Sequence, residues 1–199
     1  IARGFHENEM LGSIEGEENL KAVKGVEVVV LTLPPQHTLG VLEEIAPILD
    51  TTQIVVSTVV PMIKEGGLFR YAPLSKGQPS DKEMSAAELI QESLSSIPVV
   101  SAFQNVPATY LADVDSVLNI DVLICGNNED ALLVVSRLVK DIPNLRPLRV
   151  GPLSNSKMVE SLTPLLMNAA ILNKLKDPSI RIVPWLPLRL SGRAVVIPE

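Results

Sequence analysis

Three segments of the chain combine small or aliphatic side chains with a proline soon after a β-branched run. They are Leu31-Thr-Leu-Pro-Pro-Gln-His37, Ser57-Thr-Val-Val-Pro-Met62 and Ser101-Ala-Phe-Gln-Asn-Val-Pro-Ala108. Because proline has no amide hydrogen and so ends most central strands, the last amides and carbonyls of each run become free for a ligand. Ligands of open α/β sheets bind at the carboxyl ends of strands. The segments therefore predict a floor for a flat ring such as nicotinamide.

Covalent and metal chemistry have little support in the sequence. Ser57 and Ser101 have no partnered His and Asp pattern. His6, His37 and Cys125 are too few and too scattered for a metal site. Cys125 lies in an apolar run, so we expect it to pack as a small buried hydrophobe. We therefore predict no catalytic side chain and no metal ligand.

Composition excludes several other classes of protein. The chain has 199 residues, 46% hydrophobic but only 3% aromatic, so one domain with an aliphatic core is expected. A net charge of −6 without a basic cluster argues against a nucleic-acid partner. No apolar run is long enough to span a membrane, and the start lacks a signal-peptide pattern. A single cysteine is typical of a reducing, cytoplasmic location.

Strand-like and helix-like segments alternate along the chain, which predicts an α/β fold. The fold expected is an open parallel sheet with helices on both faces. Ser85-Ala-Ala-Glu88 predicts a capping box that starts one helix. Residues 64–82, rich in Gly, Pro, Ser and Lys, predict a long loop. Strands are expected at 26–33, 53–57, 99–103, 121–125 and 145–150, and the other helices at 38–49 and 131–140.

The last apolar helix contains a proline. Pro164 cannot donate to the carbonyl four residues earlier, so we expect a kink, or two helices with Thr163 capping the second. The apolar face of this segment is larger than one sheet face needs. One explanation is packing against the core. The other is a two-fold dimer surface, and for that reason we expect a homodimer. The face consists of Met158, Leu162, Leu165, Leu166, Ala169 and Leu172.

The stretch 151–168, a Gly-Pro turn followed by a Ser/Asn/Ser helix start, resembles the NADPH-dependent reductases of the deazaflavin coenzyme F420. Residues 29–37 and 54–62 match the same family in the expected order. The resemblance covers about 12–183 and implies a Rossmann-type domain. It also implies hydride transfer between two coenzymes, NADP(H) and F420, with F420 as the substrate.

Site residues follow from the resemblance, position by position. It implies that the nicotinamide end of the NADP site is lined by Leu33, His37, Val60, Pro61, Met62 and Ala108. The chain departs from the family at Gln104, where histidine is common. It departs again at Pro178, where a small or aliphatic residue often contacts the deazaflavin.

The family's first strand and its glycine-rich phosphate loop have no counterpart here, since no Gly-x-Gly-x-x-Gly pattern occurs. We therefore expect an N-terminally truncated domain over 1–183, missing its first βαβ unit, and a tail of unknown role at 184–199. The strand at 26–33 would then have an open edge, which predicts low stability or self-association. Weak NADP binding is also expected.

Two alternatives stay open at this stage. One is another NADP-dependent reductase on the same scaffold, similar to pyrroline-carboxylate reductases, which would need a proton donor and a separate helical domain. The other is an inactive fragment that survives as a dimerising module.

Overall fold

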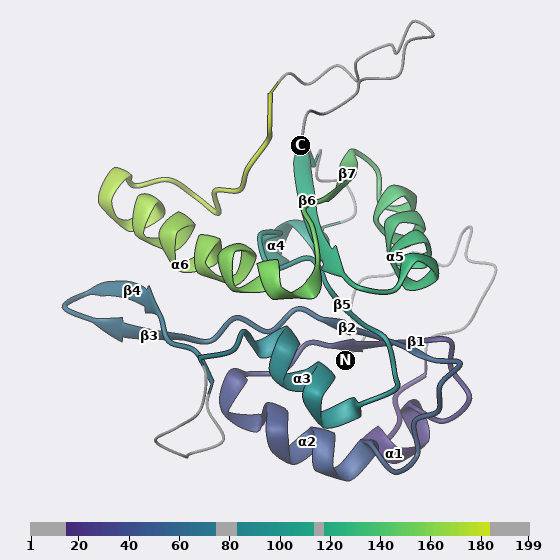
Figure 1. Cartoon of the computed structure of the whole chain (residues 1–199). Coiled ribbons are helices and arrows are strands. Elements are labelled where there is room, and N and C mark those ends of the chain that lie inside the picture. The colour runs from purple at the N-terminus through teal and green to yellow at the C-terminus, as the bar shows by residue number, and fades with distance from the viewer. Residues whose placement is uncertain (1–14, 75–82, 114–117, 184–199) are drawn as a thin grey trace, which may run out of the picture.

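The computed structural model describes residues 15–74, 83–113 and 118–183. Its centre is a five-stranded sheet with the order β1-β2-β5-β6-β7. Figure 1 shows helices on both faces of this sheet. The α/β, Rossmann-type prediction is therefore confirmed. The strands are β1 Val28–Leu31, β2 Ile54–Ser57, β5 Val99–Ser101, β6 Ile120–Gly126 and β7 Leu145–Arg149.

The sheet is mostly, not wholly, parallel. Strands β1, β2 and β5 run together, whereas β6 pairs antiparallel with β5 and parallel with β7. The reason is the connection between β5 and β6, because a parallel crossover needs a helix long enough to return the chain to the starting edge. Among the described residues of this connection, the helix is α4, Ala108–Leu111, of only four residues.

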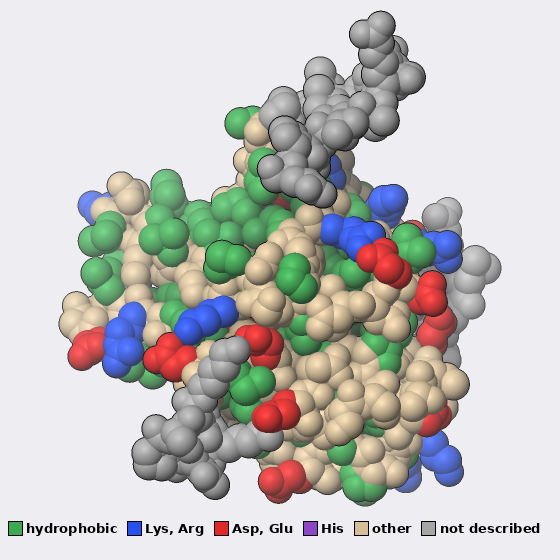
Figure 2. Space-filling model, viewed as in Figure 1, with side chains coloured by type: hydrophobic (Ala, Val, Ile, Leu, Met, Phe, Trp, Pro, Cys, Tyr) green, Lys and Arg blue, Asp and Glu red, His purple; other side chains and the backbone are tan. Residues whose placement is uncertain are grey.

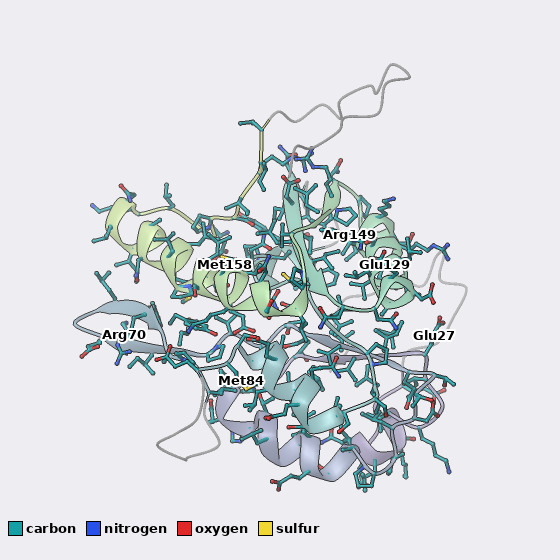
Figure 3. The ribbon with its side chains drawn as sticks, in the orientation of Figure 1. Glu27, Arg70, Met84, Glu129, Arg149 and Met158 are labelled. Carbon is teal, nitrogen blue, oxygen red and sulfur yellow. The ribbon has the colours of Figure 1, made fainter. Side chains whose placement is uncertain are left out.

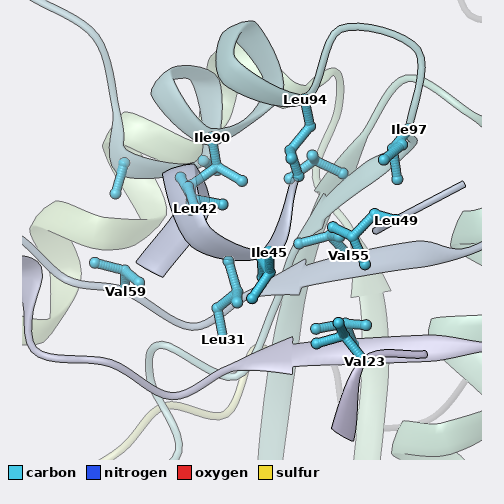
Figure 4. Packing of buried hydrophobic residues seen from close by; sticks show 14 of the residues in the cluster. Val23, Leu31, Leu42, Ile45, Leu49, Val55, Val59, Ile90, Leu94 and Ile97 are labelled. Carbon is cyan, nitrogen blue, oxygen red and sulfur yellow. The ribbon is translucent and has the colours of Figure 1, made fainter. Parts of the chain in front are cut away.

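Apolar clusters on both faces of the sheet hold the layers together, with a smaller one between β6 and α6. One face packs against α2 Thr38–Ile45 and α3 Ala86–Leu94, through side chains such as Leu42 and Ile90 (Figure 4). The other packs against α5 Glu129–Asp141. Val55 belongs to the first cluster and its neighbour Val56 to the second, as expected for a strand covered on both faces.

Strand β1 departs from this pattern. Its run of β-branched residues predicts burial on both faces, but Val30 is 46% exposed. The reason is position, because β1 is the edge strand and pairs only with β2 in the part of the chain described. The short helix α1, Asn19–Ala22, lies nearby and contributes to a cavity along this edge.

Local signals in the sequence are confirmed at the helix starts. Ser85 and Glu88 form the predicted capping box, with both reciprocal hydrogen bonds present. Asn128 caps α5 by accepting from the amide of Ala131 at 2.9 Å. These caps satisfy amides that the helix itself leaves unpaired.

The prediction of a loop over 64–82 is wrong for the first part of that range, which belongs to a β-hairpin. Strand β3, Met62–Glu65, pairs antiparallel with β4, Leu68–Tyr71. The turn between them is Gly66-Gly67, both at positive φ, which is the geometry that two-residue hairpins require. Residues 75–82 lie outside the described part.

The segment after Gly151 forms a short 3-10 turn, η2 Leu153–Asn155, and one long helix, α6 Ser156–Asn173. The alternative prediction, that the proline separates two helices, is wrong, because α6 continues through a buried Pro164. Thr163 caps nothing; its hydroxyl donates to the carbonyl of Gln104 at 2.7 Å. Tertiary contacts on both sides of the proline offset its missing hydrogen bond, which costs about 3 kcal/mol in an isolated helix.

The apolar face of α6 divides into two parts. Leu162, Leu166 and Ala169 are half-buried, but Met158, Leu165 and Leu172 are 66%, 63% and 68% exposed. Core packing therefore does not explain the last three. Hydrophobic side chains gather over α6 in Figure 2, and Figure 3 labels Met158 on this helix. No helix in the described ranges is long and apolar enough to cross a membrane.

Candidate functional site

The carboxyl ends of three neighbouring strands lie at one edge of the sheet. This follows from parallel pairing, in which Leu31 lies beside Ser57 and Ser57 beside Ser101. The hydroxyl of Thr58 donates to the carbonyl of Leu31 at 2.9 Å, and the side-chain amide of Gln104 donates to that of Ser57 at 2.9 Å. The three proline-containing segments thus leave the sheet together, as a binding floor requires.

The expected nicotinamide residues occupy the chain just beyond these strand ends. Leu33 and Val60 are half-buried, and Pro61 is buried. His37 is exposed in the 3-10 turn η1, Pro35–His37, directly before α2. Met62 is half-buried and begins β3.

Ala108 lies apart from Leu33. It begins α4 and lines a cavity of about 660 Å³ between the strand-end segment 104–109 and helix α6. Leu33 lines a different cavity, of about 290 Å³, along the open edge of β1. The residues implied by the resemblance therefore share an edge of the sheet but do not share one cavity.

The larger cavity is mostly apolar. Phe69 enters it from β4, and Leu166 and Met167 from α6. Pro178 closes it from the segment that follows α6. Its volume falls in the range of 300–1,000 Å³ that is typical of ligand sites, which is enough for a ring system.

Gln104 holds this region together. Its Nε2 atom donates to the carbonyl of Ser57 at 2.9 Å and to the hydroxyl of Ser101 at 2.7 Å. A carbonyl can only accept, so the orientation of the amide is fixed. Within the described residues, the Oε1 atom of Gln104 and the Oγ atom of Ser57 are buried with no hydrogen-bond partner. The departure from the family's histidine thus supplies a residue that joins β2 to β5.

Phe103 has a backbone conformation that sequence reasoning missed. It follows β5 with a φ of 70°, in the left-handed region that glycine prefers. Non-glycine residues in this region cost about 1–3 kcal/mol and cluster at functional sites. A phenylalanine carries no sequence signal for such a turn.

Glu160 is a second residue that the sequence did not single out. It is fully buried on α6, and its carboxylate accepts from the hydroxyl of Tyr71 at 2.7 Å. It also accepts from the amides of Ala86 and Ala87 at 3.0 and 3.1 Å, at the start of α3. Burial raises the pKa of Glu160 to about 7, although these hydrogen bonds lower it. Burial and the charge of Glu160 raise the pKa of the Tyr71 hydroxyl.

Asn168 makes a paired contact with the same hairpin. Its Oδ1 atom accepts from the amide of Phe69 at 2.7 Å, and its Nδ2 atom donates to the carbonyl of Phe69 at 2.7 Å. The side-chain amide thus pairs with β4 as a neighbouring strand would. No local sequence pattern predicts a contact across 99 residues.

The segment after α6 is tied to the sheet by Asp121. Its buried carboxylate receives two hydrogen bonds of 2.7 Å from Arg146 and one of 2.6 Å from the amide of Ile182. Burial alone would raise the pKa of Asp121, but these bonds and the charges of Arg146 and Arg181 lower it. This anchoring fixes Pro178 at the wall of the cavity.

Cys125 packs as the sequence predicts. It is fully buried in β6 and free of any disulfide. Burial, with the nearby charge of Glu160, raises its pKa to about 11, so the thiol stays protonated and unreactive at neutral pH. No group of His, Cys, Asp or Glu in the described parts of the chain is arranged to hold a metal ion.

Comparisons with known proteins agree with one another. Residues 4–61 match the family model described as NADP oxidoreductase, coenzyme F420-dependent. The F420-dependent NADP reductase of Methanocaldococcus jannaschii is 39% identical over 169 residues, which cover 85% of this chain and 73% of that protein. The reductase of the same name from Methanothermobacter thermautotrophicus is 32% identical, with coverages of 85% and 72%.

Solved structures support the fold. A crystal structure from Arthrobacter sp., provisionally described as an F420-dependent NADP reductase, superposes with a TM-score of 0.68. It covers 83% of this chain and 74% of its own, at 20% identity, so it supports the fold alone.

Proposed function

The chain belongs to the F420-dependent NADP reductase family, and from that premise we propose where its two coenzymes meet on this fold. The activity is hydride transfer between NADP(H) and coenzyme F420, which are its small-molecule partners. The observation that carries the proposed site is the shared edge where β1, β2 and β5 end beside the large cavity.

The nicotinamide ring lies over the segments that leave β1 and β2. Leu33, Val60, Pro61 and Met62 supply an apolar floor there, and His37 stands at its exposed margin. Proline endings leave backbone groups free to orient the carboxamide of the ring. Ala108 lies at the boundary with the second coenzyme, because it lines the large cavity.

The deazaflavin ring of F420 occupies the cavity of about 660 Å³. Its apolar walls suit a flat ring, and Ala108 and Pro178 present little bulk to it. When bound, the two coenzymes supply the hydride donor and acceptor. The chain's own residues hold the rings, orient them and exclude water, which is the protein's main contribution to such a transfer. No side chain is assigned an acid–base role.

We also propose a homodimer and a cytoplasmic location for this protein. The exposed residues of α6 form a homodimer interface with a second copy, since Met158, Leu165 and Leu172 repeat every seven residues along one stripe. The working domain is residues 1–183; residues 184–199 lie outside the described part. A cytoplasmic location is consistent with the free, buried Cys125.

The two alternatives are no better supported. The named relatives are F420-dependent NADP reductases at 39% and 32% identity, which favours that activity over imine reduction. A cavity of about 660 Å³ lies beside the strand ends, which favours a functional site over an inactive remnant.

An anaerobic assay tests the function. The chain is mixed with NADPH and oxidised deazaflavin, and loss of deazaflavin absorbance is followed. A second version carries a family N-terminal unit, and a third carries that unit with a bulky side chain in place of Ala108. Activity in the second and not the third supports the proposed site. A folded but inactive second version would overturn the assignment.

A further inference from the structure

The β3–β4 hairpin depends on outside support for its position. Its two strands pair only with each other in the described structure, and β3 is largely exposed. A two-stranded hairpin is marginally stable by itself in water. Strand β4 lies along α6, as Figure 1 shows. The contacts with α6 therefore decide where the hairpin stands.

Each end of β4 is bonded to a different residue of α6. Asn168 pairs with the amide and the carbonyl of Phe69, and Glu160 accepts from the hydroxyl of Tyr71. The carboxylate of Glu160 is itself fixed, because the amides of Ala86 and Ala87 donate to it from α3. The hairpin is thus held at two points by groups that cannot easily move.

These two points correspond to the two coenzyme sites. Phe69 lines the large cavity. Tyr71 is the cross-strand partner of Met62, and the amide of Ala72 donates to the carbonyl of Pro61 at 3.0 Å. The bond to Asn168 therefore sets a wall of the deazaflavin site, and the bond to Glu160 sets a wall of the nicotinamide site.

We propose that Asn168 and Glu160 are positioning residues for hydride transfer, which fix the hairpin as a common wall of both ring sites. The proposal rests on the function proposed above. Neither residue is assigned contact with the reacting atoms. They act through Phe69 and Met62, by setting the separation and tilt of the two rings. A misplacement of about 1 Å can slow a reaction by roughly 10²-fold, so such support affects the rate more than binding.

Two variants test this in the full chain joined to the family N-terminal unit. Asn168→Ala removes both bonds to Phe69, and Tyr71→Phe removes the bond to Glu160 without leaving the amides of α3 unpaired. Arg70→Ala is the matched control, since Arg70 lies on the same hairpin and its exposed side chain bonds to Glu65. Thermal melts confirm that each variant folds.

We expect both variants to lower kcat by at least about tenfold while KM for each coenzyme changes much less. Hydrogen exchange at the amide of Phe69, which donates to Asn168, should accelerate in Asn168→Ala and stay unchanged in Arg70→Ala. Faster exchange with an unchanged kcat would overturn the positioning role, and so would equal losses in kcat for the control. An inactive parent protein would instead contradict the proposed function, and exchange alone would then decide whether the hairpin is held.

Discussion

The carboxylate of Glu160 accepts a hydrogen bond of 2.7 Å from the hydroxyl of Tyr71, across 89 residues of sequence. This contact joins the long C-terminal helix α6 to the β3–β4 hairpin. The carboxyl group of Glu160 is buried, which raises its pKa, and the charge of Glu88 raises it further. The same residue therefore makes the stability of the fold depend on pH.

Glu160 should make stability fall as pH rises. Its folded pKa of about 7 lies above the value of 4.5 that is usual for a glutamate, so between these two pH values the folded state holds a proton that the unfolded chain has lost. Stability from this proton is fully present below about pH 4.5 and is lost as pH approaches 7, by about 1.4 kcal/mol per unit. Urea unfolding from pH 4.5 to 7 should show this slope in the native chain and a shallower one in Glu160→Gln.

Tyr71 and Cys125, which both face Glu160, do not titrate between pH 4.5 and 7. The pKa of Tyr71 is raised from an already high value, and that of Cys125 is about 11. Equal slopes in the native chain and the variant would contradict the assignment.

Gln104→Ala should destabilise the fold by about 1–3 kcal/mol, because the hydroxyl of Ser101 loses a buried partner and the carbonyl of Ser57 keeps only the amide of Ala102. Asn19→Ala is the control. Its amide also makes a long-range bond, to Glu44, but on the exposed surface, so a loss below about 0.5 kcal/mol is expected. The free energy of unfolding of each variant is measured by denaturant unfolding. Similar losses of stability in Gln104→Ala and Asn19→Ala would argue against the role of Gln104.

Gly151→Ala should destabilise the protein, whereas Gly40→Ala should stabilise it. Gly151 has a φ of 117°, and an added Cβ would meet Asn155 Nδ2 at a distance of 2.4 Å. Gly40 lies inside α2 with nothing within 4 Å of such an atom. We expect a loss of about 1–3 kcal/mol for the first and a gain of roughly 0.5–1 for the second, measured by thermal unfolding. A neutral Gly151→Ala would show that the turn relaxes.

Leu165→Glu should convert the proposed homodimer into a monomer. Leu165 is 63% exposed at the centre of the stripe between Met158 and Leu172. Leu133→Glu places the same charge on α5, at a residue that is 51% exposed, and should leave the dimer intact. Sedimentation equilibrium distinguishes them. A monomeric native chain, or a dimer that survives Leu165→Glu, would exclude this interface.

Ala108→Trp should block deazaflavin binding and leave NADPH binding largely unchanged, because Ala108 lines the large cavity. Ala112→Trp, one turn later at the exposed end of α4, is the control. Quenching of deazaflavin fluorescence and of NADPH fluorescence reports the two affinities separately. Undiminished deazaflavin binding in Ala108→Trp would place the ring elsewhere.

The sequence by itself determined the local structure. Runs of β-branched residues gave the sheet strands, and Ser85 with Glu88 gave the capping box, because these signals depend on neighbours within a few residues. The family resemblance also came from short ordered motifs. Even the missed hairpin had a local signal in Gly66-Gly67, which the surrounding polar composition obscured.

Only the tertiary structure decided how the site is assembled. The antiparallel β6, the role of Gln104 and the burial of Glu160 depend on partners that lie tens of residues away. Pro164 continues a helix because contacts on both sides hold it, and Phe103 accepts a strained φ because it packs against the core. Such outcomes depend on the energy of the whole fold, which no local pattern contains.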